Sequence, residues 1–214
     1  MALNVIIYFT LWMLGLQVWD SFKKRGELAS MLKGLRPRHI AWGILVLFTT
    51  LVSLAATATL AYEFADWMKW SWLTALTSHQ GSMLSAAADA GTTKSTVPKA
   101  VVYALYALLA LALPMAALVE EKMFRRGAER RSHLANVLFA LAFALGHMVV
   151  GFPVFAALAL FPLGLWLTLY YRIQWRRNGG DAGVAMLEAG RVHLMNNVLA
   201  IGLILILLSA VRGP

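Results

Sequence analysis

Five polar residues of this chain lie in or beside long apolar runs, where their side chains could do chemistry: Glu120, Glu121, His147, His193 and Asn197. Placing an ionisable group at membrane depth costs at least a few kcal/mol. Such groups therefore usually face a bundle interior or a wet cavity and usually have a function. Carboxylates, imidazoles and a carboxamide are the side chains that acid–base catalysis and oxyanion binding use.

Helical spacing separates the two glutamates. Glu121 and Arg125 are four residues apart and can pair along one helix face, whereas Glu120 points about 100° away. Glu120 is thus expected to be the freer carboxylate. A carboxylate in a dry site suits the role of general base, and a neighbouring imidazole can orient water and share the proton.

The histidines also fall on helical repeats. Phe143 and His147 share one face, and so do His193 and Asn197. The second pair could present two polar groups to one point in space, which is the geometry of a site.

Composition indicates the elements that position these residues. Sixty per cent of the 214 residues are hydrophobic, 14% are charged and the mean hydropathy is +0.69, which indicates an integral membrane protein. We expect an all-α polytopic bundle, because unpaired backbone amides are not tolerated in hydrocarbon. The absence of cysteine excludes disulfides, thiolate metal sites and cysteine nucleophiles. Six transmembrane helices are expected, at residues 2–18, 40–62, 100–119, 134–150, 154–172 and 192–211.

Two features refine these spans. The first run lacks a basic leader and a small-residue cleavage site, so we expect a retained helix. The Gly-Phe-Pro stretch at 151–153 predicts a tight break between the fourth and fifth helices, which then form a hairpin.

Helix lengths predict how deep the polar groups lie. If the third helix continues to about Arg130 and the fourth begins near His133, Glu120 and His147 lie at similar heights. A last helix starting near Asp181 would place His193 about 18 Å further along its axis. His147 is nevertheless only four residues before the Gly-Phe-Pro break, so these helices must be tilted or short for the groups to meet.

Basic residues predict the orientation. Fifteen of the 19 lysines and arginines fall in the connections at 20–39, 120–133 and 172–191. The positive-inside rule places these connections in the cytoplasm and both termini outside. We expect a bacterial inner membrane, and we expect the net charge of +9 to meet anionic lipid rather than nucleic acid.

Three tryptophans and the three other histidines are assigned to the membrane interface and to the connections. The outer segment 63–99 begins with three tryptophans, Trp67, Trp70 and Trp72, which indicates an interfacial helix, and it ends in a loop at 90–98. Three histidines lie in connections and are expected to be solvated and without a role: His39, His79 and His133.

Taken together, the motifs resemble the CAAX prenyl protease and bacteriocin-processing (Abi) family of intramembrane glutamic proteases. The resemblance is carried by Glu-Glu-x-x-x-Arg, Phe-x-x-x-His and His-x-x-x-Asn, in this order on successive apolar runs. It covers about residues 100–210, a four-helix catalytic core within 100–214, and leaves the two helices of 1–99 unmatched. Family members often read Phe-Arg-Gly after the glutamates, whereas this chain has Arg126 inserted before Gly127.

The resemblance implies a role for each residue. Glu120 and His147 would hold and deprotonate a water that attacks the scissile carbonyl, and His193 and Asn197 would donate hydrogen bonds to the oxyanion. Donors of this kind contribute roughly 3 to 4 kcal/mol each in a dry site. Three further residues would support the site: Glu121 and Arg125 as structure, and Phe143 by packing against it.

The implied enzyme needs no cofactor and acts on a peptide or protein substrate at the membrane through an opening that faces the cytoplasm. The substrate could be a prenylated CAAX protein, a bacteriocin or pheromone precursor, or a C-terminal sorting signal. Three different functions stay open. Glu120, His147 and His193 could ligate zinc in a metalloprotease; the same groups could relay protons in a transporter; or the chain could be a non-catalytic immunity or scaffold protein.

Overall fold

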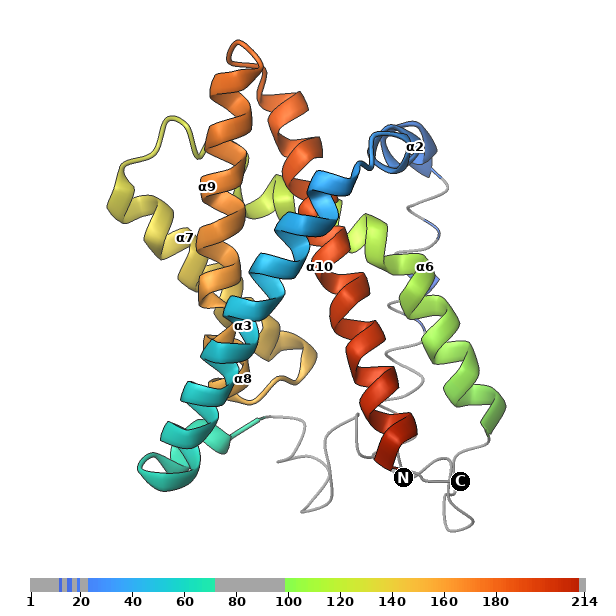
Figure 1. Cartoon of the computed structure of the whole chain (residues 1–214), viewed down its shortest axis with the longest axis vertical. Coiled ribbons are helices and arrows are strands. Elements are labelled where there is room, and N and C mark those ends of the chain that lie inside the picture. The colour runs from blue at the N-terminus through green and yellow to red at the C-terminus, as the bar shows by residue number, and fades with distance from the viewer. Residues whose placement is uncertain (1–11, 13–14, 17–18, 20–22, 72–98, 212–214) are drawn as a thin grey trace.

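The computed structural model describes residues 23–71 and 99–211, together with Trp12, Gly15, Leu16 and Trp19. In this part of the chain the regular elements are all helices (Figure 1). They are α2 (Arg25–Lys33), α3 (Pro37–Glu63), the 3₁₀ helix η1 (Asp66–Lys69), α6 (Lys99–Phe124), α7 (His133–Gly146), the 3₁₀ helix η2 (His147–Val150), α8 (Val154–Ala159), α9 (Phe161–Arg177) and α10 (Ala182–Val211).

Three segments of the described chain are long and apolar enough to cross a membrane: Pro37–Glu63, Val154–Arg177 and Ala182–Leu207. They contain the expected spans at 40–62 and 154–172 and most of the one at 192–211. These three helices confirm the predicted all-helical membrane architecture. The expected span at 100–119 lies within α6, and the one at 2–18 falls almost wholly outside the described residues. The count of six spans stays a prediction.

The expected span at 134–150 is a shorter helix than predicted. Its α-helical part, α7, has 14 residues, or about 21 Å at 1.5 Å per residue, against a hydrocarbon core of about 30 Å. The chain then tightens into η2 and turns at Gly151, whose φ of 93° is left-handed. Pro153 precedes α8, and α7 lies beside both α8 and α9. The predicted break and hairpin are therefore present.

The end of α6 differs from the expectation that this helix continues to about Arg130. It ends at Phe124, where the backbone N–H groups of Arg125 and Arg126 both donate to the carbonyl of Glu121. Gly127 follows with a φ of 85°, a left-handed conformation that glycine adopts without strain. The glycine two residues beyond Arg125 thus stops the helix soon after the two glutamates.

Local capping explains where the two other helices of the site begin. The Ser132 side chain accepts a hydrogen bond from the backbone N–H of Ala135 at the start of α7. Asp181 accepts one from the N–H of Val184 at 2.9 Å at the start of α10. The predicted start of the last helix near Asp181 is confirmed, which makes His193 the twelfth residue of α10.

Helix α10 occupies the middle of the bundle, with α3 and α9 on one side of it and α6 on the other (Figure 1). Small residues allow close packing at two of the crossings. A Cβ added at Gly43 of α3 would lie 3.0 Å from Met195 Cβ, and one at Gly164 of α9 would lie 2.9 Å from the carbonyl oxygen of Ala140. Helix α3 therefore lies close against α10, and α9 lies close against α7.

The segment after α3 is partly described. Trp67 in η1 and Trp70 just after it expose 66% and 53% of their surface, as expected for an interfacial segment. Ser71 donates to the carbonyl of Gly151 at 2.7 Å, which ties this segment to the turn after η2. Trp72 and the expected loop at 90–98 lie outside the described residues.

Candidate functional site

His193 lies between the two adjacent glutamates. Its Nδ1 is 3.0 Å from Oε1 of Glu121, and its Nε2 is 3.4 Å from Oε2 of Glu120. The glutamates come from the last turn of α6 and the histidine from α10. One imidazole thus contacts both carboxylates, which the sequence had assigned to different helix faces.

The contacts limit where protons can be. An ionised carboxylate only accepts hydrogen bonds, so Nδ1 of His193 carries the proton that it donates to Glu121. In a neutral imidazole Nε2 would then be an acceptor facing a second carboxylate. The contact with Glu120 is therefore favourable when one proton is shared between Nε2 of His193 and the Glu120 carboxyl. This is an acid–base pair.

Burial distinguishes the two glutamates. Glu121 and Arg125 are fully buried, whereas the side chain of Glu120 keeps 30% of its surface exposed. Glu121 Oε1 is 3.5 Å from Arg125 Nη1, as the spacing of four residues predicts. Glu120 is thus the carboxylate that solvent or substrate can reach, and Glu121 is enclosed between a cation and an imidazole.

His147 stands at the end of α7 and faces the same cluster. Its Nδ1 donates to the carbonyl of Phe143 at 2.9 Å, which leaves Nε2 of the neutral ring as an acceptor. Its imidazole interacts electrostatically with Glu120 and with His193. The sequence predicted that His147 would reach the level of Glu120 only if the helices were tilted or short, and α7 is short.

Phe143 packs at the centre of these groups. Its ring lies 4.9 Å from the ring of His147 and 5.7 Å from that of His193, both edge to face. The Arg125 guanidinium carbon lies 4.0 Å from the centroid of the Phe143 ring, within the range of a cation–π contact. Phe143 therefore contacts the buried Arg125 and both imidazoles, and its ring restricts the orientation of theirs.

Asn197 is less closely connected to the cluster than predicted. It lies one turn beyond His193 on α10 and is half-buried, and its Oδ1 accepts a hydrogen bond of 3.3 Å from Nδ2 of Asn196. This bond leaves the amide N–H groups of Asn197 as donors. Asn196, which is 4% exposed, is a buried neighbour that the sequence analysis did not single out.

Several buried polar atoms in this region lack a hydrogen-bond partner within the described protein. They are Oε2 of Glu120, Oε2 of Glu121, Oδ1 of Asn196, and Nε, Nη1 and Nη2 of Arg125. Buried polar atoms in folded proteins are nearly always paired with protein or ordered water. The cluster is therefore suited to hold water or a polar part of a substrate. Among the described residues, no three His, Asp or Glu side chains are arranged to hold a metal ion.

The prediction that His39 is solvated is wrong. His39 is fully buried at the start of α3, where this helix packs against α10. Its Nδ1 accepts from the backbone N–H of Arg36 at 2.9 Å, and its Nε2 is 2.9 Å from Oε2 of Glu188. His133 is exposed as predicted, and His79 lies outside the described residues.

Two residues of α10 were missed by the sequence analysis. Glu188 is 6% exposed and Arg191 is 9% exposed, and they form an ion pair with each other. Arg191 was counted as a charge of the third basic connection, although the helix start expected near Asp181 already placed it inside a helix. Its spacing of three residues from Glu188 was the signal that could have identified the pair.

No family model, curated protein or solved structure matches this chain.

Proposed function

We propose that this chain is an intramembrane endopeptidase that hydrolyses a peptide bond of a membrane-associated substrate. The observation that carries the proposal is the position of His193 between a buried glutamate and a partly exposed one, with His147 packed against the same Phe143 ring as His193. A reachable carboxylate beside two imidazoles can activate water. The enclosed Glu121 can keep Nδ1 of His193 protonated and fix the orientation of its ring, as the acidic member of a catalytic triad does.

The proposed reaction uses one water and returns every proton. The water oxygen bonds to the scissile carbonyl carbon while its proton passes to Glu120, with His147 Nε2 orienting the water. The carbonyl electron pair moves onto oxygen, and this oxyanion accepts hydrogen bonds from the Asn197 amide and from Nε2–H of His193, which is doubly protonated in this step while Glu120 is the base. The carbon–nitrogen bond then breaks, and Glu120 gives its proton to the leaving nitrogen.

The surroundings of the site are part of the proposal. The chain would cross the membrane six times, with its basic connections in the cytoplasm, and the substrate would reach Glu120 from that side because Glu120 borders the connection at 120–133. The substrate class is a prenylated CAAX protein, a bacteriocin or pheromone precursor, or a C-terminal sorting signal. A bacterial inner membrane is the proposed location.

Comparative proteomics of membrane fractions tests the proposal. Cells that produce the wild-type chain are compared with cells that produce Glu120→Gln, and Glu63→Gln serves as a control because Glu63 is an exposed carboxylate at the end of α3. We expect a precursor to accumulate only with Glu120→Gln. Equal proteomes and an intact phenotype with Glu120→Gln would favour a non-catalytic scaffold.

Two further experiments distinguish the proposed peptidase from a zinc protease and from a transporter. A chelator should leave cleavage unchanged if Glu120 and His147 activate water without a metal, and it should stop cleavage by a zinc enzyme. Flux measured in proteoliposomes would identify a transporter, for which no cleaved product is expected.

A further inference from the structure

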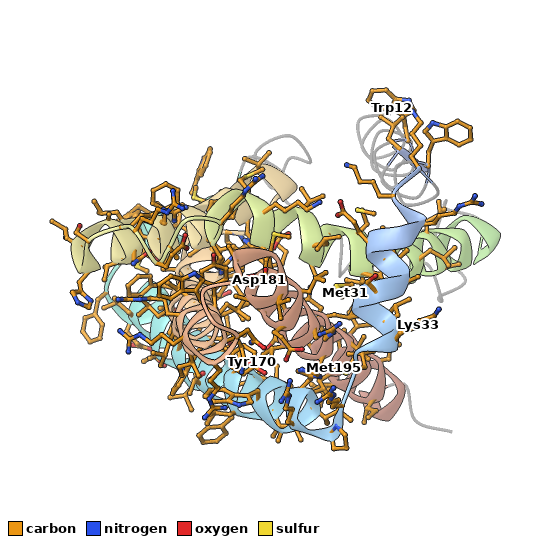
Figure 2. The ribbon with its side chains drawn as sticks, turned by 90° about the horizontal axis from the view of Figure 1, so that it is seen from above. Trp12, Met31, Lys33, Tyr170, Asp181 and Met195 are labelled. Carbon is orange, nitrogen blue, oxygen red and sulfur yellow. The ribbon has the colours of Figure 1, made fainter. Side chains whose placement is uncertain are left out.

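The short helix α2 is attached to the two helices that carry the glutamates and His193. Figure 2 shows α2 lying across the end of the bundle, beside α6 and α10, with Met31 on this helix. The side chains of Glu27 and Lys122 form an ion pair between α2 and α6, one residue beyond Glu121. Helix α2 is thus held directly beside the candidate site.

Arg191 makes the attachment to α10. Its guanidinium donates from Nε to the carbonyl of Met31 at 2.9 Å, from Nη2 to the carbonyl of Ser30 at 2.7 Å, and from Nη1 to Glu188. Carbonyls in the last turn of a helix lack partners within the helix, so Arg191 caps the C-terminal turn of α2. Each of its three nitrogens has a hydrogen-bond partner, which offsets the cost of burying the charge.

Glu188 joins this attachment to the start of α3. Its Oε2 accepts from His39 at 2.9 Å and from Nη2 of Arg38 at 2.6 Å. Gly34, at the end of α2, leaves room for the guanidinium: a Cβ there would lie 1.9 Å from Nη2 of Arg191. The end of α2, the start of α3 and the middle of α10 therefore meet at one buried ion pair.

The attachment reaches the candidate site through Met31. A Cβ placed at Gly190 of α10 would lie 3.3 Å from Sδ of Met31 and 3.8 Å from Cγ of Glu121. Met31 is fully buried and packs in one cluster with Leu118 of α6 and Leu194 of α10. Met31 of α2 and the Glu121 side chain thus approach the same point of α10, three residues before His193.

We infer that Arg191 is a positioning residue, which holds α2 against α6 and α10 so that Glu121 stays dry and keeps Nδ1 of His193 bound. The chemical consequence of this role rests on the proposed peptidase function. The docking of α2 is independent of the peptidase proposal and can be measured separately.

Cross-linking measures the docking, because the chain has no cysteine of its own. Cysteines replace Glu27 and Lys122, whose side chains are 50% and 31% exposed, and a short thiol cross-linker joins them in membranes. We expect several-fold slower cross-linking when Arg191→Ala is added. Arg176→Ala, an exposed arginine near the end of α9, removes the same charge and should leave the rate unchanged. An unchanged rate with Arg191→Ala would overturn the inference.

The state of His193 gives a second measurement that needs no substrate. Histidine ring NMR of the purified full chain should show the signal of the His193 Nδ1 proton, identified by its loss in His193→Gln. This signal should weaken or shift in Arg191→Ala and be largely kept in Arg176→Ala. A signal that is the same in both variants would contradict the positioning role.

Covalent rescue separates positioning from folding. Arg191→Ala should reduce processing of the precursor found with Glu120→Gln, and cross-linking residues 27 and 122 in this variant should restore it. Slower cross-linking with normal processing would overturn the positioning role and leave the peptidase proposal intact. If the wild-type chain processes no precursor, the peptidase proposal fails, and the cross-linking and NMR results still decide what Arg191 does.

Discussion

At the residue scale, the two neighbouring glutamates have different environments and should respond differently to the same substitution. Glu120 is partly exposed, and its ionisable neighbour at 3.4 Å is His193. Glu121 is fully buried against Arg125 and His193. Replacing each by glutamine keeps the size of the side chain and removes the charge and the basicity.

Glu120→Gln should remove activity and keep the fold. General acid–base catalysis contributes about 10²- to 10⁴-fold to a rate, so we expect cleavage of the precursor to slow by at least the lower of these factors. The thermal midpoint in detergent should stay close to that of the wild type, because 30% of this side chain is exposed. A variant that cleaves at the wild-type rate would exclude Glu120 as the base.

Glu121→Gln should destabilise the fold. Removing one partner of a buried ion pair costs about 3–5 kcal/mol, because the other charge is left uncompensated. Here that charge is Arg125, which is fully buried and has no second carboxylate within ion-pair distance among the described residues. We expect a clear fall in the unfolding midpoint measured in the same detergent.

The double variant Glu121→Gln/Arg125→Met is the control for this explanation. It removes the stranded cation and keeps an apolar side chain next to Phe143, so it should recover part of the lost stability. If the double variant is less stable than Glu121→Gln alone, the uncompensated charge is not the cause.

Part of this residue-level arrangement could be predicted from the sequence. Helical periodicity places Arg125 beside Glu121 and His147 beside Phe143, because residues four apart on one helix are neighbours. Periodicity cannot place residues on different helices relative to one another. Counting residues along the helices predicted that Glu120 and His193 could meet, as they do at 3.4 Å. The sequence missed the contact of His193 with Glu121 and the burial of His39 against Glu188, which depend on how α3, α6 and α10 cross.

At the element scale, the ends of two helices determine where the catalytic candidates lie. Gly127 closes α6 soon after Glu121, and Gly151 closes η2 four residues after His147. The sequence predicted the second stop from the Gly-Phe-Pro stretch. It did not predict the first, because Glu-Lys-Met-Phe-Arg-Arg continues with residues that are compatible with a helix, and only the conformation of one glycine ends it.

Gly151→Ala should destabilise the turn that follows His147. A left-handed conformation costs a residue with a Cβ about 1–2 kcal/mol, and Gly151 has a φ of 93° while its carbonyl accepts the Ser71 hydroxyl. We expect a lower unfolding midpoint and, if His147 orients the water, slower cleavage.

Gly202→Ala is the matched control, because Gly202 lies inside α10 and an added Cβ would meet nothing within 4 Å. Alanine is favoured over glycine within helices by about 0.5–1 kcal/mol, so this variant should be as stable as the wild type or slightly more stable. Equal losses of stability in both variants would show that the conformation at Gly151 is not what matters.

At the scale of the whole molecule, the three long apolar segments support a membrane protein, and the distribution of charge predicts its orientation. Helix α3 separates the basic connection before it from the tryptophans after it. The turn at 125–132 and the last turn of α9 carry further arginines, and both are expected on the side of the first basic connection. The lack of cysteine makes this arrangement directly measurable.

Single cysteines at Asp66, Arg130 and Asn178 should report the two sides of the membrane. All three positions are exposed. With a thiol reagent that cannot cross membranes, Asp66→Cys should react in intact spheroplasts, and Arg130→Cys and Asn178→Cys should react only after the membrane is opened. Labelling of Arg130→Cys and Asn178→Cys from opposite sides would mean that α7 and α9 do not form a complete membrane hairpin. Glu120 would then border a different compartment from the one that the positive-inside rule assigns to it.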